Sequence, residues 1–193
     1  MRVLAALGNP GAAYAFTRHN AGFMLGDWLA RQWKFPPFRR SGQASVTDGT
    51  FRGERVGLVK PRTQMNRSGL ALRPLVASSD FDPATQLLVL VDDFAIPLGS
   101  FRVRARGSAG GHNGLKSVED ALGSPEYARL RIGVGPLPAD SIDPADFVLG
   151  QMSDEELDTI GKSLPLLQET VECWITEDID TTMNRFNRRG QSD

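Results

Sequence analysis

Short apolar runs between glycine- and proline-containing turns indicate where the chain forms strands. Residues 3–6 make one such run, which breaks at Gly8-Asn9-Pro10-Gly11, and residues 87–91 make a continuous one, which ends at Asp92-Asp93. Apolar runs of this length are typical of buried strands. Further strands are expected as a hairpin around Gly53 within residues 44–60, and singly over residues 101–106 and 129–134.

Helical spacing of apolar residues predicts the helices. The longest amphipathic stretch covers residues 155–174, and shorter helices are expected over residues 20–33, 70–77, 115–122 and 178–187. Residues 61–69 and the proline- and aspartate-rich residues 136–144 are expected to be loops. Since strands and helices mix, and some strands follow one another directly, the pattern favours an α/β fold in which a mixed sheet carries helices on both faces.

Composition narrows the class of protein. The 193 residues carry a net charge of -1, 40% hydrophobic residues and a single cysteine, Cys173. This length favours one α/β domain or at most two small ones. A single cysteine excludes an internal disulfide framework and is typical of a reducing compartment. No apolar stretch approaches the ~20 residues that cross a bilayer, and the N-terminal run is too short for a signal peptide, so the cytoplasm is the expected location.

The two histidines of the chain stand in similar surroundings. Each is followed by asparagine and lies in or just after a glycine-rich stretch, as His19-Asn20 and as His112-Asn113. Glycine lets a ligand approach the backbone, histidine moves protons near neutral pH, and asparagine both donates and accepts hydrogen bonds without charge. This placement predicts an enzyme with one histidine-centred site.

His19 is the first candidate for a general base. It follows a predicted strand by one loop and precedes a predicted helix, where α/β proteins place their sites. A general base needs an acidic partner that holds the imidazole in one tautomer, and Asp92 or Asp93, at the end of the most apolar strand, could supply it. The competing interpretation is a residue at the start of a helix that makes only a structural hydrogen bond.

Residues 107–116 follow a predicted strand and open a helix, as phosphate-binding loops do. The segment matches neither Gly-x-Gly-x-x-Gly nor the Walker pattern, because Lys116 does not follow Gly114 directly. It therefore favours a nucleotide cofactor only weakly, and a flexible turn is the alternative. Residues 60–69 form another polar loop after a strand, with Asn66 and a potential helix cap at Ser68.

Three arginines alternate along one predicted strand. Arg102, Arg104 and Arg106 would then project from the same face, where Lys116, Arg129 and Arg131 could join them. No acidic residue is interleaved with this row, which favours a phosphate-bearing ligand over a solvated surface. Because the net charge is -1, any nucleic-acid contact must come from a local patch of this kind.

Other chemistries find little support in the sequence. Two histidines and one cysteine supply too few ligands to favour a metal site, and Cys173 lies on the apolar face of a predicted helix. Ser68 and Ser108 lack the Gly-x-Ser-x-Gly elbow of a serine nucleophile. We therefore expect neither a metal nor a cofactor.

Several motifs together resemble those of bacterial-type peptidyl-tRNA hydrolases, and they occur in the same order over essentially the whole chain. The motifs are Leu7-Gly8-Asn9-Pro10-Gly11, Tyr14, Thr17-Arg18-His19-Asn20-Ala21-Gly22-Phe23, Lys60-Pro61-x-Thr63-x-Met65-Asn66-x-Ser68-Gly69, Asp92-Asp93 with Pro97-Leu98-Gly99, Gly107-Ser108-Ala109-Gly110-Gly111-His112-Asn113-Gly114-Leu115-Lys116, Arg129-Leu130-Arg131-Ile132-Gly133-Val134-Gly135, Phe147-Val148-Leu149-Gly150 and Met183-Asn184-Arg185-Phe186-Asn187. A series of long motifs in order is far more specific than any one of them.

The resemblance implies a single α/β domain over residues 1–193, with a twisted mixed sheet between helices. It implies hydrolysis of the ester that joins a peptide to the terminal ribose of tRNA, without a metal, a cofactor or a covalent nucleophile. Such hydrolysis needs an activated water and a stabilised oxyanion, which a neutral histidine and neutral amides can supply. The implied partner is peptidyl-tRNA, and the implied state is a monomer in the cytoplasm.

The same resemblance assigns roles to residues. It implies that His19 is the catalytic base and Asp92 its orienting carboxylate. The residues implied to bind the substrate are Asn9, Tyr14, Met65, Asn66, His112 and Asn113. The residues implied to bind tRNA phosphates are Arg102, Arg104, Arg106, Lys116 and Arg131.

Two positions depart from the usual pattern of this family. Ala95 stands where many members carry an acidic residue, and Gln64 stands where many carry an aromatic one. Activity is nevertheless expected, because the catalytic set is complete. A non-catalytic RNA-binding or RNA-processing relative of the same fold is the alternative, and the presence of His19 and Asp92 favours the enzyme. A nucleotide-cofactor enzyme that uses residues 107–116 is the weakest interpretation.

Overall fold

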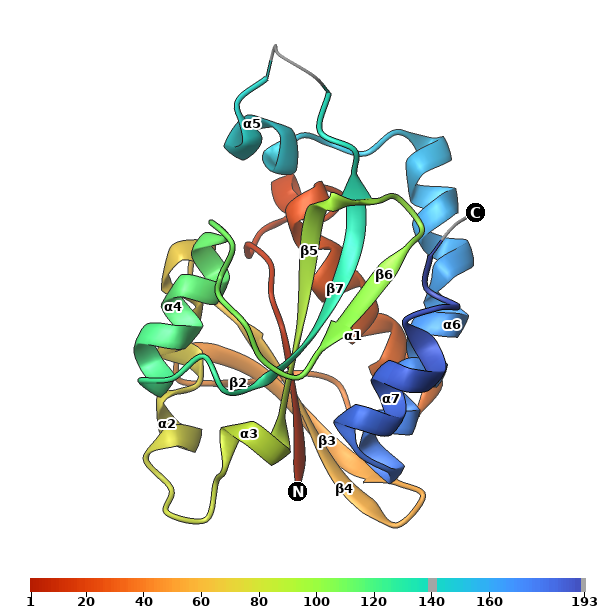
Figure 1. Cartoon of the computed structure of the whole chain (residues 1–193). Coiled ribbons are helices and arrows are strands. Elements are labelled where there is room, and N and C mark those ends of the chain that lie inside the picture. The colour runs from red at the N-terminus through yellow and green to blue at the C-terminus, as the bar shows by residue number, and fades with distance from the viewer. Residues whose placement is uncertain (139–141, 192–193) are drawn as a thin grey trace.

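One sheet organises the molecule. The computed structural model describes residues 1–138 and 142–191, and within these ranges seven strands lie in the order β2-β3-β4-β1-β5-β7-β6 (Figure 1). The strands are β1 (Arg2–Ala6), β2 (Arg39–Ser41), β3 (Ala44–Phe51), β4 (Glu54–Pro61), β5 (Leu87–Pro97), β6 (Phe101–Arg104) and β7 (Ala128–Gly135).

The pairing within the sheet is mixed. β1 lies parallel between β4 and β5, and β5 is parallel to β7, whereas β3 and β6 run antiparallel to their neighbours. The central strands are buried on both faces, which explains their continuous apolar runs. The carboxyl ends of β4, β1, β5 and β7 therefore meet at one edge, which we call the carboxyl edge. Open α/β sheets bind their ligands at this edge.

Helices cover both faces of the sheet (Figure 1). One hydrophobic core packs α1, α6 and α7 against the sheet, and a second core packs α4 and η3 against the opposite face. The expected α/β fold, with a mixed sheet between helices, is confirmed. The helices are η1 (Ala12–Tyr14), η2 (Arg18–Asn20), α1 (Ala21–Gln32), η3 (Met65–Ala71), α2 (Arg73–Val76), α3 (Pro83–Gln86), α4 (Asn113–Leu122), α5 (Pro144–Leu149), α6 (Asp154–Thr176) and α7 (Ile179–Phe186), where η marks a 3-10 helix.

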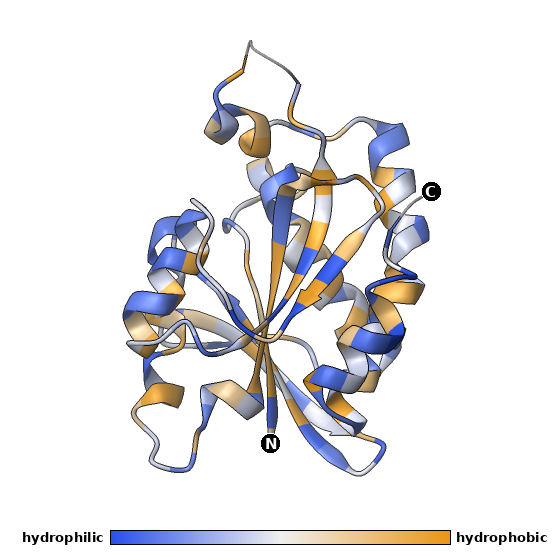
Figure 2. Cartoon of the chain, in the orientation of Figure 1, coloured by the Kyte–Doolittle hydropathy of each residue, from blue (hydrophilic) through white to orange (hydrophobic). Residues whose placement is uncertain are grey.

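Hydropathy follows this layering. Figure 2 shows apolar colour along the central strands, and apolar and polar stretches that alternate around the helices. Such alternation is expected of helices that bury one side against a sheet. Among the described residues, no helix combines the length and the apolar character needed to cross a membrane.

The largest strand β5 extends beyond its expected end. It does not stop before Asp92 but runs on to Pro97, paired with β7 as far as Gly135. Glycines on β7 permit this close approach, since a Cβ on Gly133 would lie 2.0 Å from the carbonyl oxygen of Pro97. Asp92 is therefore held inside a strand and not in a loop, which limits its freedom.

Other boundaries also differ from expectation. The prediction of a loop over residues 61–69 is wrong, because η3 begins at Met65. η3 packs directly on α4, where a Cβ on Gly69 would lie 1.9 Å from the Ser117 carbonyl oxygen. The helix expected over residues 70–77 is reduced to α2. β2, α3 and α5 are absent from the sequence-based expectation. Of the loop expected over residues 136–144, residues 139–141 lie outside the described residues, and α5 begins at Pro144.

Candidate active site

A cleft of about 760 Å³ opens at the carboxyl edge of the sheet. All the residues that the sequence assigned to catalysis and substrate binding line it, namely Asn9, Tyr14, His19, Met65, Asn66, Asp92, His112 and Asn113. They come from the segments after β1 and after β4, from within β5, and from the start of α4. The fold therefore brings together in one cleft residues that are far apart along the chain.

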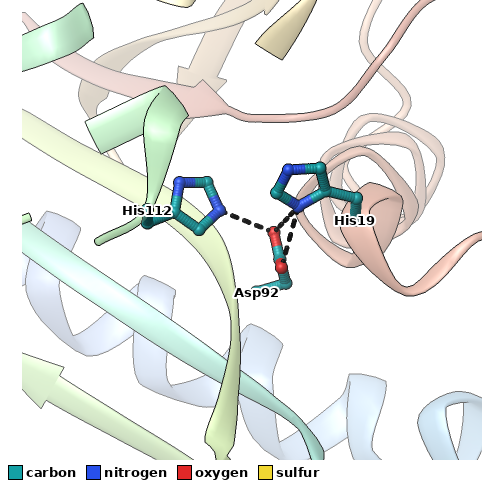
Figure 3. Close-up of side chains that lie close together, drawn as sticks. All are labelled: His19, Asp92 and His112. Atoms are coloured by element: carbon teal, nitrogen blue, oxygen red, sulfur yellow. Dashed lines mark hydrogen bonds and ion pairs between the residues drawn. The ribbon is translucent and has the colours of Figure 1, made fainter. Parts of the chain in front are cut away.

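Asp92 lies at the centre of this cleft. Its side chain is 1% exposed and points between two imidazole rings, as Figure 3 shows. His19 Nδ1 lies 2.9 Å from both carboxylate oxygens, and His112 Nε2 lies 2.9 Å from Oδ1. The two rings are themselves close, with centroids 4.8 Å apart. One buried carboxylate thus accepts hydrogen bonds from both histidines of the chain.

The bond to Asp92 fixes the tautomer of His19. A carboxylate only accepts hydrogen bonds, so Nδ1 carries the ring proton and Nε2 keeps a lone pair. Nε2 lies on the side of the ring away from Asp92 (Figure 3), and the ring lines the cleft. His19 belongs to η2, a single turn that leads into α1. This arrangement is that of a general base with its orienting acid.

His112 has two roles in the structure. It is the N-cap of α4, where its Nδ1 accepts hydrogen bonds from the backbone N–H groups of Gly114 at 3.1 Å and Leu115 at 3.3 Å. Because Nδ1 is an acceptor, Nε2 carries the ring proton and donates a hydrogen bond to Asp92. The sequence assigned His112 only to substrate binding and predicted neither of these two roles. The helix was expected to begin at Leu115, but it begins at Asn113, since His112 caps it although histidine is not among the usual cap residues.

The surroundings keep Asp92 charged. Burial alone would raise the pKa of the carboxyl group, but the adjacent imidazoles of His112 and His19, which donate hydrogen bonds to it, hold the pKa of Asp92 well below its usual range. The carboxylate is therefore available as an acceptor throughout the range in which histidine chemistry operates. A buried charge of this kind is tolerated only where hydrogen bonds replace its water.

The same three residues could in principle hold a cation. Their ligand atoms lie within 4.8 Å of one another. However, His19 Nδ1 and His112 Nε2 both face the carboxylate at hydrogen-bond distance, and each carries the proton of its bond. A metal ion would have to displace both protons. Hydrogen bonding alone accounts for the arrangement of the three side chains.

Asn9 is fixed by neighbouring backbone and side-chain groups. Its Oδ1 accepts the N–H of Met65 at 2.7 Å, so its Nδ2 is oriented as a donor. The Asn20 side chain bonds both backbone groups of Asn9, at 2.8 Å to N and 3.0 Å to O. In contrast, Asn66 and Asn113 are exposed at the cleft. The three asparagines thus present neutral amides to one space.

The basic residues do not form the single row that the sequence predicted. β6 ends at Arg104 instead of continuing to Arg106, because the chain bends there toward Gly107. Although no acidic residue is interleaved with the row in the sequence, Arg106 pairs with Glu126, from a later segment, at 3.6 Å. Arg102 and Arg104 alone share the strand face.

The other cations have separate surroundings. Arg131 lies opposite Arg102 across the β6–β7 pair, lines the cleft, and pairs with Asp93 at 2.9 Å. Lys116 is exposed on α4. Arg129 cannot join a phosphate site, because it is 1% exposed and donates to the carbonyl oxygens of Gly107 and Ser108. Arg129 instead orders the start of the glycine-rich loop.

Sequence reasoning missed one wall of the cleft. Asp143, Pro144, Ala145, Val148 and Leu149 line it from α5 and the residue before it. Arg18 ties this wall to the His19 turn, since its side chain lies over the Phe147 ring at 4.4 Å and pairs with Glu156 at 2.6 Å. The arginine next to His19 in the sequence was the available signal, but its partners are more than a hundred residues away.

Comparison with known proteins adds to this geometry. The family model described as peptidyl-tRNA hydrolase matches residues 3–193. The chain belongs to the peptidyl-tRNA hydrolase family. The expected family, and with it the assignment as an enzyme of the hydrolase class, is confirmed. Ala95 and Gln64, the two departures from the usual pattern of the peptidyl-tRNA hydrolases, both line the cleft.

Individual relatives agree over nearly their whole length. The peptidyl-tRNA hydrolase of Gemmatimonas aurantiaca is 44% identical over 190 residues, which cover 97% of this chain and 100% of the relative. That of Bacillus pumilus is 43% identical over 183 residues, which cover 95% and 96%. The crystal structure of peptidyl-tRNA hydrolase from Acinetobacter baumannii matches with a TM-score of 0.89 at 30% identity, covering 97% of this chain and 94% of that chain.

The charge of Asp92 makes a pH-dependent contribution to stability. The pKa of Asp92 is lower in the folded state than in the unfolded state. The carboxylate therefore stabilises the fold at pH values above the ordinary pKa of aspartate, and this stabilisation declines as the pH falls below about 4. We expect Asp92→Asn to lower the free energy of unfolding at neutral pH, and the difference from wild type to narrow between about pH 5 and about pH 3. Urea unfolding followed by circular dichroism at each pH measures the free energy of unfolding, and the variant Asp120→Asn, at an exposed position, is the control. A difference that stays constant over this range would contradict an ionised Asp92.

Proposed function

We propose that the chain hydrolyses the ester between a peptide, or an N-blocked amino acid, and the 3′-terminal ribose of tRNA, with His19 as general base and without a metal. The observation that carries this proposal is the hydrogen bond from His19 Nδ1 to the buried Asp92, which leaves Nε2 free at the cleft. Membership of the peptidyl-tRNA hydrolase family supports the choice of substrate. We also propose that residues 1–193 act as one domain, as a monomer, in the cytoplasm.

The proposed chemistry proceeds by direct attack of water. His19 Nε2 takes a proton from the water as its oxygen attacks the ester carbonyl carbon. Asp92 holds the ring and stabilises the imidazolium that forms. The tetrahedral intermediate then releases the ribose oxygen, which takes the proton back from His19. Peptide acid and tRNA leave, and the base is regenerated.

Neutral amides surround the reacting ester. Asn113 and Asn66 are proposed to donate to the developing oxyanion, and Asn9 Nδ2 to donate to the peptide side of the substrate. A neutral donor stabilises negative charge without adding a cation beside His19. Tyr14 and Met65 are proposed to contact the substrate from the cleft walls.

The RNA part of the substrate is proposed to bind beside this cleft. Arg102 and Arg104 share one strand face, and Arg131 adjoins Arg102 and reaches the cleft. Lys116 is exposed on α4, the helix that begins at His112. Arg106 remains in this proposal, since its exposed ion pair with Glu126 contributes little stability and can exchange for a phosphate.

Turnover is the direct test of the proposed function. We expect the purified protein to release N-acetyl-amino acid from N-acetyl-aminoacyl-tRNA equally well with and without EDTA. Removing a general base typically costs about 10²–10⁴-fold in rate, so His19→Ala should lose most of kcat while it stays folded by circular dichroism. RNA binding without hydrolysis by the wild type would favour the non-catalytic relative. Loss of activity with EDTA would contradict the metal-free mechanism.

His112 can be tested separately from its role as a helix cap. Asparagine is a good N-cap but is too short to reach Asp92, so His112→Asn keeps the cap and removes the second donor. We expect this variant to lower kcat more than it raises KM, with a thermal midpoint close to that of wild type. His112→Ala should lose stability as well. A His112→Asn variant with unchanged kcat would show that the second imidazole serves only as a cap.

The phosphate-binding role predicts a salt effect. Arg102→Ala combined with Arg104→Ala should raise KM much more than it lowers kcat, and should reduce the log–log salt slope of tRNA binding by roughly 0.7–0.9 per lost contact. The matched control is Arg39→Ala combined with Arg55→Ala, which removes the same charge from residues that pair with Asp48 elsewhere on the sheet. Equal slopes for the two double variants would contradict the role.

A further inference from the structure

A second hollow adjoins the cleft at the carboxyl edge. Its volume is about 400 Å³, and Asn9 is the residue that it shares with the cleft in the described part of the chain. It lies over the residues that follow β1 and β4, and over the start of α1. Its lining includes Ala12, Ala15, Phe23, Met24 and Ser45. We call it the Asn9 hollow.

The Asn9 hollow has mainly apolar walls, and its polar rim carries the Lys60–Asp27 ion pair and Arg62. The Phe23 ring is fixed over Gly8, where a Cβ would lie 2.6 Å from Phe23 Cγ. Lys60 lies 4.6 Å above the same ring, and its Nζ pairs with Asp27 at 2.6 Å. Since Lys60 is already paired with Asp27, and Arg62 is exposed at the rim, the apolar walls favour a mainly apolar occupant.

Strand order gives the direction of the substrate. Along the carboxyl edge, Arg102 and Arg131 belong to β6 and β7, Asp92 belongs to β5, and the Asn9 hollow lies over β1, β4 and β3. The substrate proposed above is also linear, from RNA through the ribose ester to the peptide. If its phosphates lie at β6 and β7 and its ester lies at β5, its peptide continues toward β1 and β4.

Asn9 stands at the junction of the two spaces. Its Oδ1 is occupied by the Met65 N–H, and its Nδ2 has no hydrogen-bond partner within residues 1–138 and 142–191. The free donor therefore suits a peptide carbonyl that passes from the cleft into the hollow. The side chain that follows such a carbonyl toward the N-terminus of the peptide would enter the apolar walls.

We propose that the Asn9 hollow is a subsite for the peptide residue that precedes the esterified one, and that it favours an apolar side chain there. This inference rests on the proposed function, since it names which part of the substrate occupies the hollow. An occupied apolar pocket distinguishes side chains by about tenfold or more in kcat/KM. The enzyme should therefore select among peptides by their penultimate residue.

The test compares two substrates that differ only at that residue. N-acetyl-dipeptidyl-tRNAs with the same esterified residue carry either leucine or glycine before it. We expect wild type to prefer leucine by about tenfold in kcat/KM. Ala15→Trp fills the hollow and should bring this preference close to one. Ala13→Trp is the control, because Ala13 is exposed on the same η1 turn and lines neither space.

A second variant guards against misfolding. Ser45→Trp fills the hollow from β3, on the opposite wall, and should abolish the preference in the same way. Equal kcat/KM values for the two substrates in wild type would overturn the inference, as would an unchanged preference in both filled variants. Failure of wild type to cleave either substrate would overturn the proposed function itself, and with it this inference.

Discussion

A buried carboxylate between two imidazoles is the constraint on which the site depends. A charge as buried as that of Asp92 is stable only where hydrogen bonds replace water. The two donors come from different elements, His19 from η2 and His112 from the start of α4. The fold must therefore bring both elements against β5 before the charge can be accommodated. The packing of α1 on one face and α4 on the other achieves this.

The surrounding elements are tied to this centre by specific bonds. Arg18 joins the His19 turn to α5 and to the start of α6 through Phe147 and Glu156. Arg129 orders the start of the glycine-rich loop that leads to His112. Asn20 brackets the backbone of Asn9. Arg18 and Asn20 are the sequence neighbours of His19, whereas Arg129 reaches the glycine-rich loop from β7, 22 residues after Gly107. The cleft is thus held by a shell of polar contacts, and not by hydrophobic packing alone.

The sequence predicted those strands and site residues that depend on a local pattern of residues. Continuous apolar runs located β1, β5 and β7, because strands buried on both faces carry such runs. The motifs located His19, Asp92 and the asparagines. The extent of β5 was missed because it depends on glycines in a different strand, at Gly133 and Gly135. The wall made by α5 and the pairing of Arg106 were missed because their partners are remote in sequence.

The direct bond between His112 and Asp92 was missed for a different reason. Its signal is a histidine in a cap position, where the local preference is for serine, threonine or aspartate. Only the three-dimensional placement of α4 shows that the ring faces β5. Similarly, the sequence suggested a row of three arginines, but whether a strand continues from Arg104 to Arg106 is decided by the bend before Gly107.

The cap at the start of α4 has a mechanical consequence. One imidazole ring is bonded on one side to the first turn of a helix and on the other side to the carboxylate that orients the base. No flexible segment separates these two bonds. A shift of α4 along its axis would therefore stretch the hydrogen bond to Asp92 directly. Lys116 belongs to the same first turns of that helix. The position of α4 and the orientation of the His19 ring by Asp92 are therefore coupled.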